Sequence, residues 1–380
     1  MTVAVATVAT YALPLFFTAS LALDIQRDLD LTVARLGVAI TAFWVVATAA
    51  SFPAGRLVDR IGAIRTGRVA GALVVAGSLG IAAAPSFVVF TAFLAVTAIG
   101  NAIIPTAMSA LVTGELRARR RGTVLGLQQA GPPLASVVAG LALPTLGTSL
   151  GWRPVFVLGA AAAALATLAV RGGEGRPLAL RAAAHPHGGD ERGFIRLLAL
   201  GGLLASAAAN GLIAYLVVYA ADSGLSEGAA GILLAVASVI CVATRIRLGV
   251  RVDRRRDPLL PQMAVLVVVG TVGFALLVVG AVPAVVAGAL LAVGVGWGWS
   301  GLYILAAVEH GTAGAGRAVG TAVTGSFAGA TLGPLLVALV ATIASFEVAW
   351  AVCAGLSVAG AAAFLAAGRH ALRVSRVVAG

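Results

Sequence analysis

The chain has no lysine, few charged residues of either sign and only two cysteines. Asp, Glu, Lys and Arg together make up 11% of its 380 residues, against about 25% in a typical soluble protein. This scarcity of charge excludes an ordinary water-soluble globular domain. Cys241 and Cys353 both lie inside apolar runs, so the sequence indicates neither a disulfide framework nor a metal site.

The sequence also lacks the residue patterns of catalysis. No phosphate-binding loop of the G-x-x-x-x-G-K-[ST] type occurs, so ATP cannot drive the protein directly. No catalytic acid, base, nucleophile or metal cluster recurs in the loops. We therefore expect neither an enzyme nor a bound cofactor. A membrane enzyme, or a sensor that does not transport, is a remote alternative.

What is present is predominantly apolar, with 60% hydrophobic residues and a mean hydropathy of +1.05. A membrane-spanning helix needs about 20 mostly apolar residues. Twelve segments of that kind occur, at 3–23, 33–54, 68–85, 87–112, 123–145, 153–171, 196–220, 229–248, 260–281, 284–308, 318–343 and 348–368. The predicted fold class is an all-α integral membrane protein with twelve transmembrane helices.

The arginines predict how the chain crosses the membrane. All 26 basic residues are Arg. If both termini are cytoplasmic, only Arg27, Arg35 and Arg153 lie at the outer side and the other 23 lie inside. Basic residues favour the cytoplasmic loops of membrane proteins. We expect a multi-pass protein of the cell inner (cytoplasmic) membrane, with the lipid bilayer and a small molecule as partners and no nucleic acid.

The two halves of the sequence repeat each other. A shift of 194 residues, without gaps, superimposes Asp28 on Asp222, Asp59 on Asp253, Arg60 on Arg254 and Glu115 on Glu309, together with several glycines. Such a repeat is typical of transporters whose two six-helix bundles share one orientation. The predicted organisation is a six-helix bundle at 1–171, a cytoplasmic linker at 172–195 and a second six-helix bundle with a short tail at 196–380.

One loop carries a known signature. The residues after the second apolar segment read Gly55-Arg-Leu-Val-Asp59-Arg60-Ile-Gly62. This run resembles the G-x-L-x-D-R-x-G motif of the major facilitator superfamily of transporters, and a weaker copy reads Gly249-Val-Arg-Val-Asp253-Arg254. Gly151-Trp152-Arg153 and Gly131-Pro132 are also similar to that family. The resemblance covers the whole chain and implies the family's fold of two pseudo-symmetric bundles.

In that family the first motif forms a cytoplasmic latch, which holds the halves together when the cavity faces outward. The resemblance implies latch roles for Gly55, Asp59, Arg60, Gly62, Gly249, Asp253 and Arg254. Gly55 is expected to permit a tight turn and a close helix approach. Asp59 is expected to pair with Arg or with a positive helix N-terminus. Alternatively, the arginines only set the topology and Asp59 balances their charge.

The subfamily stays unassigned. Many proton-driven exporters of the family carry an Arg where this chain has Val96, and their pattern in the fifth helix is only partly met after Gly126. Both departures weaken a likeness to drug exporters. The run of Gln128 through Pro133 and the Gly-rich tenth segment bear a weak likeness to cyanate-permease-like members.

Uncharged polar and aromatic residues are the candidates for the substrate pathway. An unpaired amide in hydrocarbon is costly, so we expect one of Gln128 and Gln129 to line the cavity and the other to bond a neighbouring helix. In the family, helices one, four, seven and ten line the path. Trp299 and Tyr303 are four residues apart and share a helical face. Together with what the resemblance implies, this gives the pathway candidates Tyr11, Asn101, Gln128, Gln129, Asn210, Tyr215, Trp299 and Tyr303. Each could instead serve packing or anchor the membrane interface.

Two charged residues lie at the ends of spans. Asp24, at the outer end of the first, is a candidate for proton coupling, or else a solvated loop acid beside Asp28 and Asp30. Arg245, at the inner end of the eighth, could reach an anionic substrate, or else extend to the cytoplasmic surface as long basic side chains often do.

The predicted function is secondary active transport of a small, neutral or weakly charged organic molecule by alternating access. Export is slightly favoured over the alternative, an uptake permease for a small solute or anion. Protons are a candidate coupling ion, and the protein is expected to work as a monomer.

Overall fold

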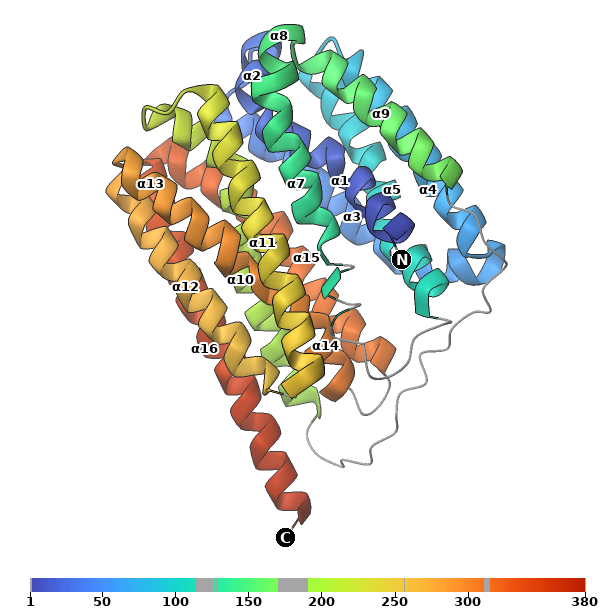
Figure 1. Cartoon of the computed structure of the whole chain (residues 1–380), viewed down its shortest axis with the longest axis vertical. Coiled ribbons are helices and arrows are strands. Elements are labelled where there is room, and N and C mark those ends of the chain that lie inside the picture. The colour runs from blue at the N-terminus through green and yellow to red at the C-terminus, as the bar shows by residue number, and fades with distance from the viewer. Residues whose placement is uncertain are drawn as a thin grey trace.

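The computed structural model describes residues 2–113, 123, 126–127, 129–169, 191–255, 257–310 and 315–379. The described residues form a bundle of long helices (Figure 1). The N-terminal half comprises α1 (Thr2–Ser20), α2 (Ala22–Leu29), α3 (Val33–Ile61), α4 (Ala63–Ala82), α5 (Phe87–Thr113), α7 (Gly131–Ala142), a π-helical turn η2 (Leu143–Gly147), α8 (Thr148–Leu150) and α9 (Trp152–Ala169).

The C-terminal half repeats this plan with more continuous helices. It comprises α10 (Glu191–Asp222), α11 (Glu227–Arg255), α12 (Leu259–Val279), α13 (Val282–Ala289), the π-helical η3 (Leu290–Val295), the 3₁₀-helical η4 (Gly296–Trp299), α14 (Ser300–His310), α15 (Ala315–Ile343) and α16 (Phe346–Ala379). The segment from α13 to α14 crosses as one span, Val282–Glu309.

The helices account for the predicted membrane spans. Ten helices of the described chain are long and apolar enough to cross a bilayer, and α1 passes the same test when joined to α2. A shorter apolar helix, Gly131–Gly147, occupies the place of the predicted span 123–145. A 66° bend at Leu21 turns α2 away from α1. Because α2 carries Asp24, Arg27 and Asp28, we take α1 alone as the span. The predicted all-α membrane fold is confirmed.

The helices extend further than predicted at one end of the bundle. Gly55, Asp59 and Arg60 belong to the last turns of α3 and not to a loop, and the chain turns only at Gly62, whose φ is +80°. Only glycine adopts that conformation without strain. Likewise, Gly249, Asp253 and Arg254 are helical residues of α11. The expectation of a turn at Gly55 was wrong, because an apolar span can continue as a helix into water.

The domain boundaries agree only in part with the helices. α10 begins at Glu191, so the last residues of the predicted linker 172–195 are helical. Residues 170–190 lie outside the described part of the chain.

Small residues bring helices into close contact, most clearly on α15. A Cβ added to Gly325, Gly329 or Gly333 would lie 2.1–2.4 Å from a backbone oxygen of α10. Three glycines at four-residue spacing therefore let the two backbones touch. Such contacts are a usual means of helix association in lipid.

The buried core differs between the two ends of the bundle. We call the end that carries Arg60, Arg65, Arg251 and Arg369 the arginine-rich end. At the opposite end, one continuous cluster of buried residues contains side chains of both halves, from Leu13 and Phe43 to Leu212 and Trp350. At the arginine-rich end, each half has its own cluster. The halves are thus joined at the opposite end and packed separately at the arginine-rich end.

Candidate functional site between the two halves

Two helix pairs make most of the contacts between the halves. α3 packs against α15, and α7 packs against α11; Figure 1 shows α7 beside α11 along much of their length. Between α7 and α11, an added Cβ at Gly140 would lie 2.5 Å from the carbonyl oxygen of Gly231. Ser238 and Ser136 are hydrogen-bonded at 2.8 Å across the same seam. The seam is therefore a backbone contact with one buried hydroxyl pair.

Polar contacts close the opposite end. Arg27 on α2 forms a two-pronged ion pair with Glu227 at the start of α11. Tyr215 on α10 donates to the carbonyl of Val33 at 3.3 Å, and Thr41 on α3 donates to the carbonyl of Thr331 at 3.4 Å. Each contact links the N-terminal half to the C-terminal half. Tyr215, predicted as a pathway residue, is thus part of this closure.

Asp24 lies beside the ion pair. Its carboxylate is 3.5 Å from Arg27, and its second oxygen is buried without a hydrogen-bond partner. Burial raises the pKa of Asp24, and the nearby Glu227 raises it further, while Arg27 opposes the shift. A carboxyl group in that position takes up a proton more readily than a solvated one. Asp24 is therefore partly buried and paired, unlike a solvated loop acid, and its role in proton coupling stays a prediction.

Aromatic side chains meet in the middle of the bundle. Phe16 on α1 lies against Trp297 of η4, with ring centroids 6.4 Å apart. Trp44 on α3 contacts Phe327 on α15 at 5.7 Å. Each pair joins the two halves. The tenth span loses its α-helical form at 290–299, beside Trp297, as expected of a Gly-rich, bendable helix.

Arg245 on α11 is the buried cation of this region. Its side chain is 2% exposed, so the expectation that it extends to the surface was wrong. It donates to the carbonyl of Gln129, and to the carbonyl of Trp297 at 3.1 Å. Its guanidinium carbon lies 4.5 Å from the centre of the Trp297 ring. The cation is therefore held by carbonyls and an aromatic face.

The sequence explains why one of those carbonyls, that of Gln129, lacks a helical partner. In an α-helix the carbonyl of Gln129 would accept from residue 133, but Pro133 has no N–H to donate. The carbonyl of Trp297 belongs to the 3₁₀ turn between η3 and α14, and it also accepts from the hydroxyl of Ser300 at 3.4 Å. A buried carbonyl left unpaired is costly. Arg245 thus satisfies breaks in two neighbouring spans and ties the fifth span to the eighth.

At the arginine-rich end, one predicted latch residue makes a contact between the halves. Asp253 on α11 accepts from the backbone N–H of Thr123 at 2.8 Å and from its hydroxyl at 2.5 Å. The carboxylate of Asp253 thus contacts the backbone and the hydroxyl of a residue in the N-terminal half. Gly249 lies on the same side, 3.7 Å from a Cβ added to Gly126. Arg60 and Arg254 are exposed, and the side chain of Asp59 lies outside the described part.

Several predicted pathway residues point within their own half. Tyr11 bonds Thr167 at 2.6 Å and the carbonyl of Gly67 at 3.3 Å. Tyr303 donates to the carbonyl of Ala322 at 2.8 Å, and Trp299 packs on Tyr303. Asn210 bonds Ser206 one turn earlier on α10. These contacts favour packing roles.

The two remaining pathway candidates are placed only in part. Asn101 is half-buried on α5, and Gln128 lies outside the described residues.

The sequence did not single out the aromatic rings that contact each other across the halves, namely those of Phe16, Trp44, Trp297 and Phe327. The chosen Trp299 lies two residues from Trp297 and so faces the other side of its helix. One signal was available for Arg245, because a basic residue in an apolar segment without a nearby acid needs another partner.

Two helical halves with a repeated plan, joined through aromatic and backbone contacts, have the architecture of membrane transporters built from parallel repeats. The family model described as Major Facilitator Superfamily matches residues 3–315. The chain belongs to this family and is a secondary transporter, a multi-pass integral membrane protein and not an enzyme.

Solved structures share the fold. A bacterial homolog of the human lysosomal transporter Spinster matches with a TM-score of 0.67 and 17% identity, over 99% of this chain and 96% of that one. The match is the same for its inward-facing occupied and inward-facing unoccupied structures. No curated protein sequence matches the chain significantly.

Proposed function

We propose that this transporter exports a small, neutral or weakly charged organic molecule, with its arginine-rich end and both termini in the cytoplasm. The region where the halves meet carries the proposal: it is lined by the aromatic pairs Phe16–Trp297 and Trp44–Phe327, and its buried cation, Arg245, already has carbonyl partners. An apolar, aromatic surface suits a molecule without a full charge.

The positions of the arginines support the orientation, because basic residues favour cytoplasmic ends. With that orientation, the described state is closed to the outside, and its halves pack separately toward the cytoplasm. We propose that Gly55, Asp59, Arg60 and Gly62, with Gly249, Asp253 and Arg254, act as a latch when the protein opens outward. In the described state Asp253 already contacts Thr123 of the other half, which places this latch residue next to the N-terminal half before the arginine-rich end closes.

A ligand screen followed by flux measurement tests the proposal. Purified protein is first screened by thermal shift against neutral, zwitterionic and singly charged organic molecules, since a ligand stabilises the state that it binds. The best binder is then assayed in inverted and right-side-out vesicles. Export predicts uptake into inverted vesicles. Trp44→Ala should weaken binding, whereas Val88→Ala, at a side chain 73% exposed, is the matched control with unchanged binding.

Anion uptake is a second candidate, favoured by one observation. Within the described residues no carboxylate forms an ion pair with Arg245, and its Nε is buried without a partner. A carboxylate or phosphate could complete that site. Accumulation of the best binder in right-side-out vesicles, driven by an inside-positive potential and lost in Arg245→Gln, would favour this candidate over export of a neutral molecule.

A further inference from the structure

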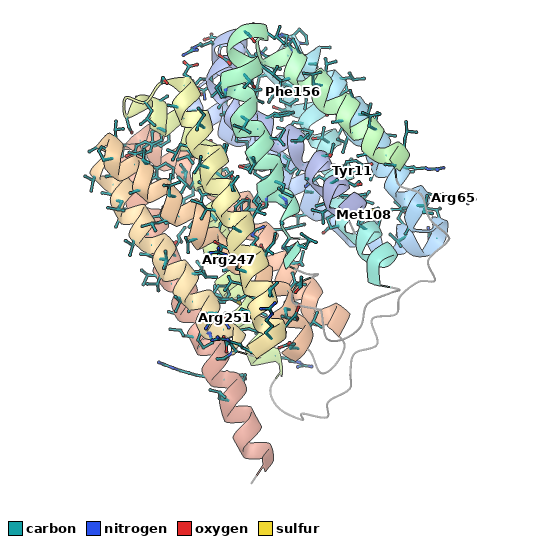
Figure 2. All side chains as sticks on the ribbon, in the orientation of Figure 1. Tyr11, Arg65, Met108, Phe156, Arg247 and Arg251 are labelled. Carbon is teal, nitrogen blue, oxygen red and sulfur yellow. The ribbon has the colours of Figure 1, made fainter. Side chains whose placement is uncertain are left out.

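A cavity of about 420 Å³ lies on α11 near the arginine-rich end. Its described lining residues are Ile246, Arg247, Val250, Arg251, Arg254 and Arg255. Figure 2 labels Arg247 and Arg251, which lie one turn apart on this part of the helix. Four arginines and two apolar residues of a single helix therefore line one open hollow.

These residues share one face of α11. Positions 246, 247, 250, 251 and 254 recur at the spacing of one helical face. The other face carries Arg245, Gly249 and Val252, which are buried. The cavity thus lies away from the seam with α7, and among the described residues its arginines make no hydrogen bond or ion pair to the N-terminal half.

Toward the start of α11, the same helix face is apolar. Ile232, Val236 and Val239 are 48%, 46% and 53% exposed. In an integral membrane protein, exposed aliphatic side chains on a spanning helix face lipid. Ile246 and Val250 carry the stripe into the cavity. One helix face is therefore apolar along the span and cationic at its end.

The cationic charge of the cavity is mostly uncompensated. Arg251 pairs with Asp257 at 2.7 Å. Asp253 faces Thr123 on the other side. Across the described parts of the chain, no ion pair joins a carboxylate to Arg247, Arg254 or Arg255. A role in membrane topology requires only the charge of these arginines and does not require a hollow with Ile246 and Val250 beside them.

We propose that this cavity binds the headgroup of an anionic phospholipid, with the phosphate at Arg247 and Arg251 and an acyl chain along Ile232, Val236 and Val239. Guanidinium groups bind phosphate oxygens through paired N–H donors. Clusters of basic residues at the end of a spanning helix attract anionic lipids. The apolar stripe favours a lipid over a soluble phosphate, because only the lipid has an acyl chain that can contact the aliphatic side chains.

Native mass spectrometry of the purified full-length protein tests the site. The protein in detergent is titrated with phosphatidylglycerol, or with phosphatidylcholine of the same acyl chains. Wild type should retain phosphatidylglycerol and not phosphatidylcholine. The double variant Arg247→Gln, Arg251→Gln should raise the apparent Kd for phosphatidylglycerol by about tenfold. Millimolar inorganic phosphate should leave the bound lipid in place.

The matched control is Arg65→Gln, Arg68→Gln, which removes two exposed arginines of α4 at the same end and should bind as wild type does. Both variants change exposed side chains, and thermal unfolding checks that each is folded. Equal loss of lipid in both variants, equal binding of the two lipids, or displacement by inorganic phosphate would each overturn the proposal.

Discussion

At the scale of single residues, buried polar side chains are satisfied largely by backbone carbonyls. Arg245 donates to Gln129 and Trp297, Tyr215 to Val33 and Tyr303 to Ala322. In lipid no water is available to complete a hydrogen bond, so each freed carbonyl needs a protein donor. A carbonyl contact tolerates small sliding movements better than an ion pair with fixed geometry.

The contact of Asp253 with Thr123 should be energetically coupled. Asp253→Asn and Thr123→Val each remove part of this contact. The double variant should change the free-energy difference between the two end states by less than the sum of the single variants. We expect a coupling free energy of about 1–3 kcal/mol, measured from the populations of the two end states. Additive single effects would show that the two side chains do not stabilise each other.

Asp24 should make the closure of the opposite end depend on pH. Burial raises its pKa in the closed state, and opening would return it toward its ordinary value of 3.8. The proton therefore favours closure: this stabilisation is fully present below the ordinary pKa and is lost as the pH rises through the raised pKa. Arg27 and Glu227 face Asp24 and set the size of the shift.

Spin-label distances across the opposite end give the measurement. With labels at Leu150 and Val282, 57% and 37% exposed, the open fraction should grow with pH in wild type. Asp24→Asn should flatten this dependence, and Asp30→Asn, at an exposed acid, should keep it. The role of Asp24 would be refuted by a wild-type pH dependence in Asp24→Asn.

Sequence could predict which residues are buried in lipid but not which way each faces. Spans that are apolar on every side carry little rotational signal. For this reason Trp299 and Tyr11 were chosen for the pathway, although they pack within one half, while Phe16 and Trp297 were missed. Gln129 was anticipated as a polar partner, but its backbone carbonyl, freed by Pro133, makes the contact with Arg245.

At the scale of helices, glycine contacts determine how closely the halves approach. Gly140 and Gly231 bring α7 and α11 together so closely that an added Cβ at Gly140 would lie 2.5 Å and 2.7 Å from backbone atoms of α11. Backbone cannot rotate away as a flexible side chain can. This seam is therefore rigid in the closed state, and the small residues on both sides were a signal that the sequence offered.

Gly140→Ala should disfavour the state that is closed at the opposite end. We expect a penalty of about 1–3 kcal/mol for the overpacked seam, seen as a longer distance between labels at Leu150 and Val282. Gly320→Ala is the control, since a Cβ there meets nothing within 4 Å. Both substitutions share the gain in helix propensity. Equal distances in both variants would contradict the prediction.

The departures from α-helical form could be anticipated only in outline. The glycines of the tenth span predict a bendable helix, and the structure has π and 3₁₀ turns at 290–299. A second π turn, Leu143–Gly147, ends α7. Whether a π or a 3₁₀ turn forms depends on which neighbouring groups pair with the backbone N–H and C=O groups that leave the α-helical pattern. Tertiary packing determines those neighbours, and the local sequence does not.

At the scale of the whole molecule, the division of the core shows how the halves can move. One shared cluster joins them at the opposite end, and two separate clusters lie at the arginine-rich end. Because each half keeps its own core at one end, it can rotate as a body about the seams without unpacking. The 194-residue repeat in the sequence predicted two such bodies, but not which end is closed.

Asp59 should control the balance between the two end states. As a latch residue it would stabilise the outward-open state, so Asp59→Asn should favour the described state by about 1–3 kcal/mol and slow transport about tenfold. Membrane insertion should be unchanged. Labels at Arg65 and Arg369, both exposed at the arginine-rich end, should report a larger fraction of separated halves. A variant that transports at the wild-type rate with wild-type distances would mean that Asp59 only balances the charge of nearby arginines and does not act as a latch.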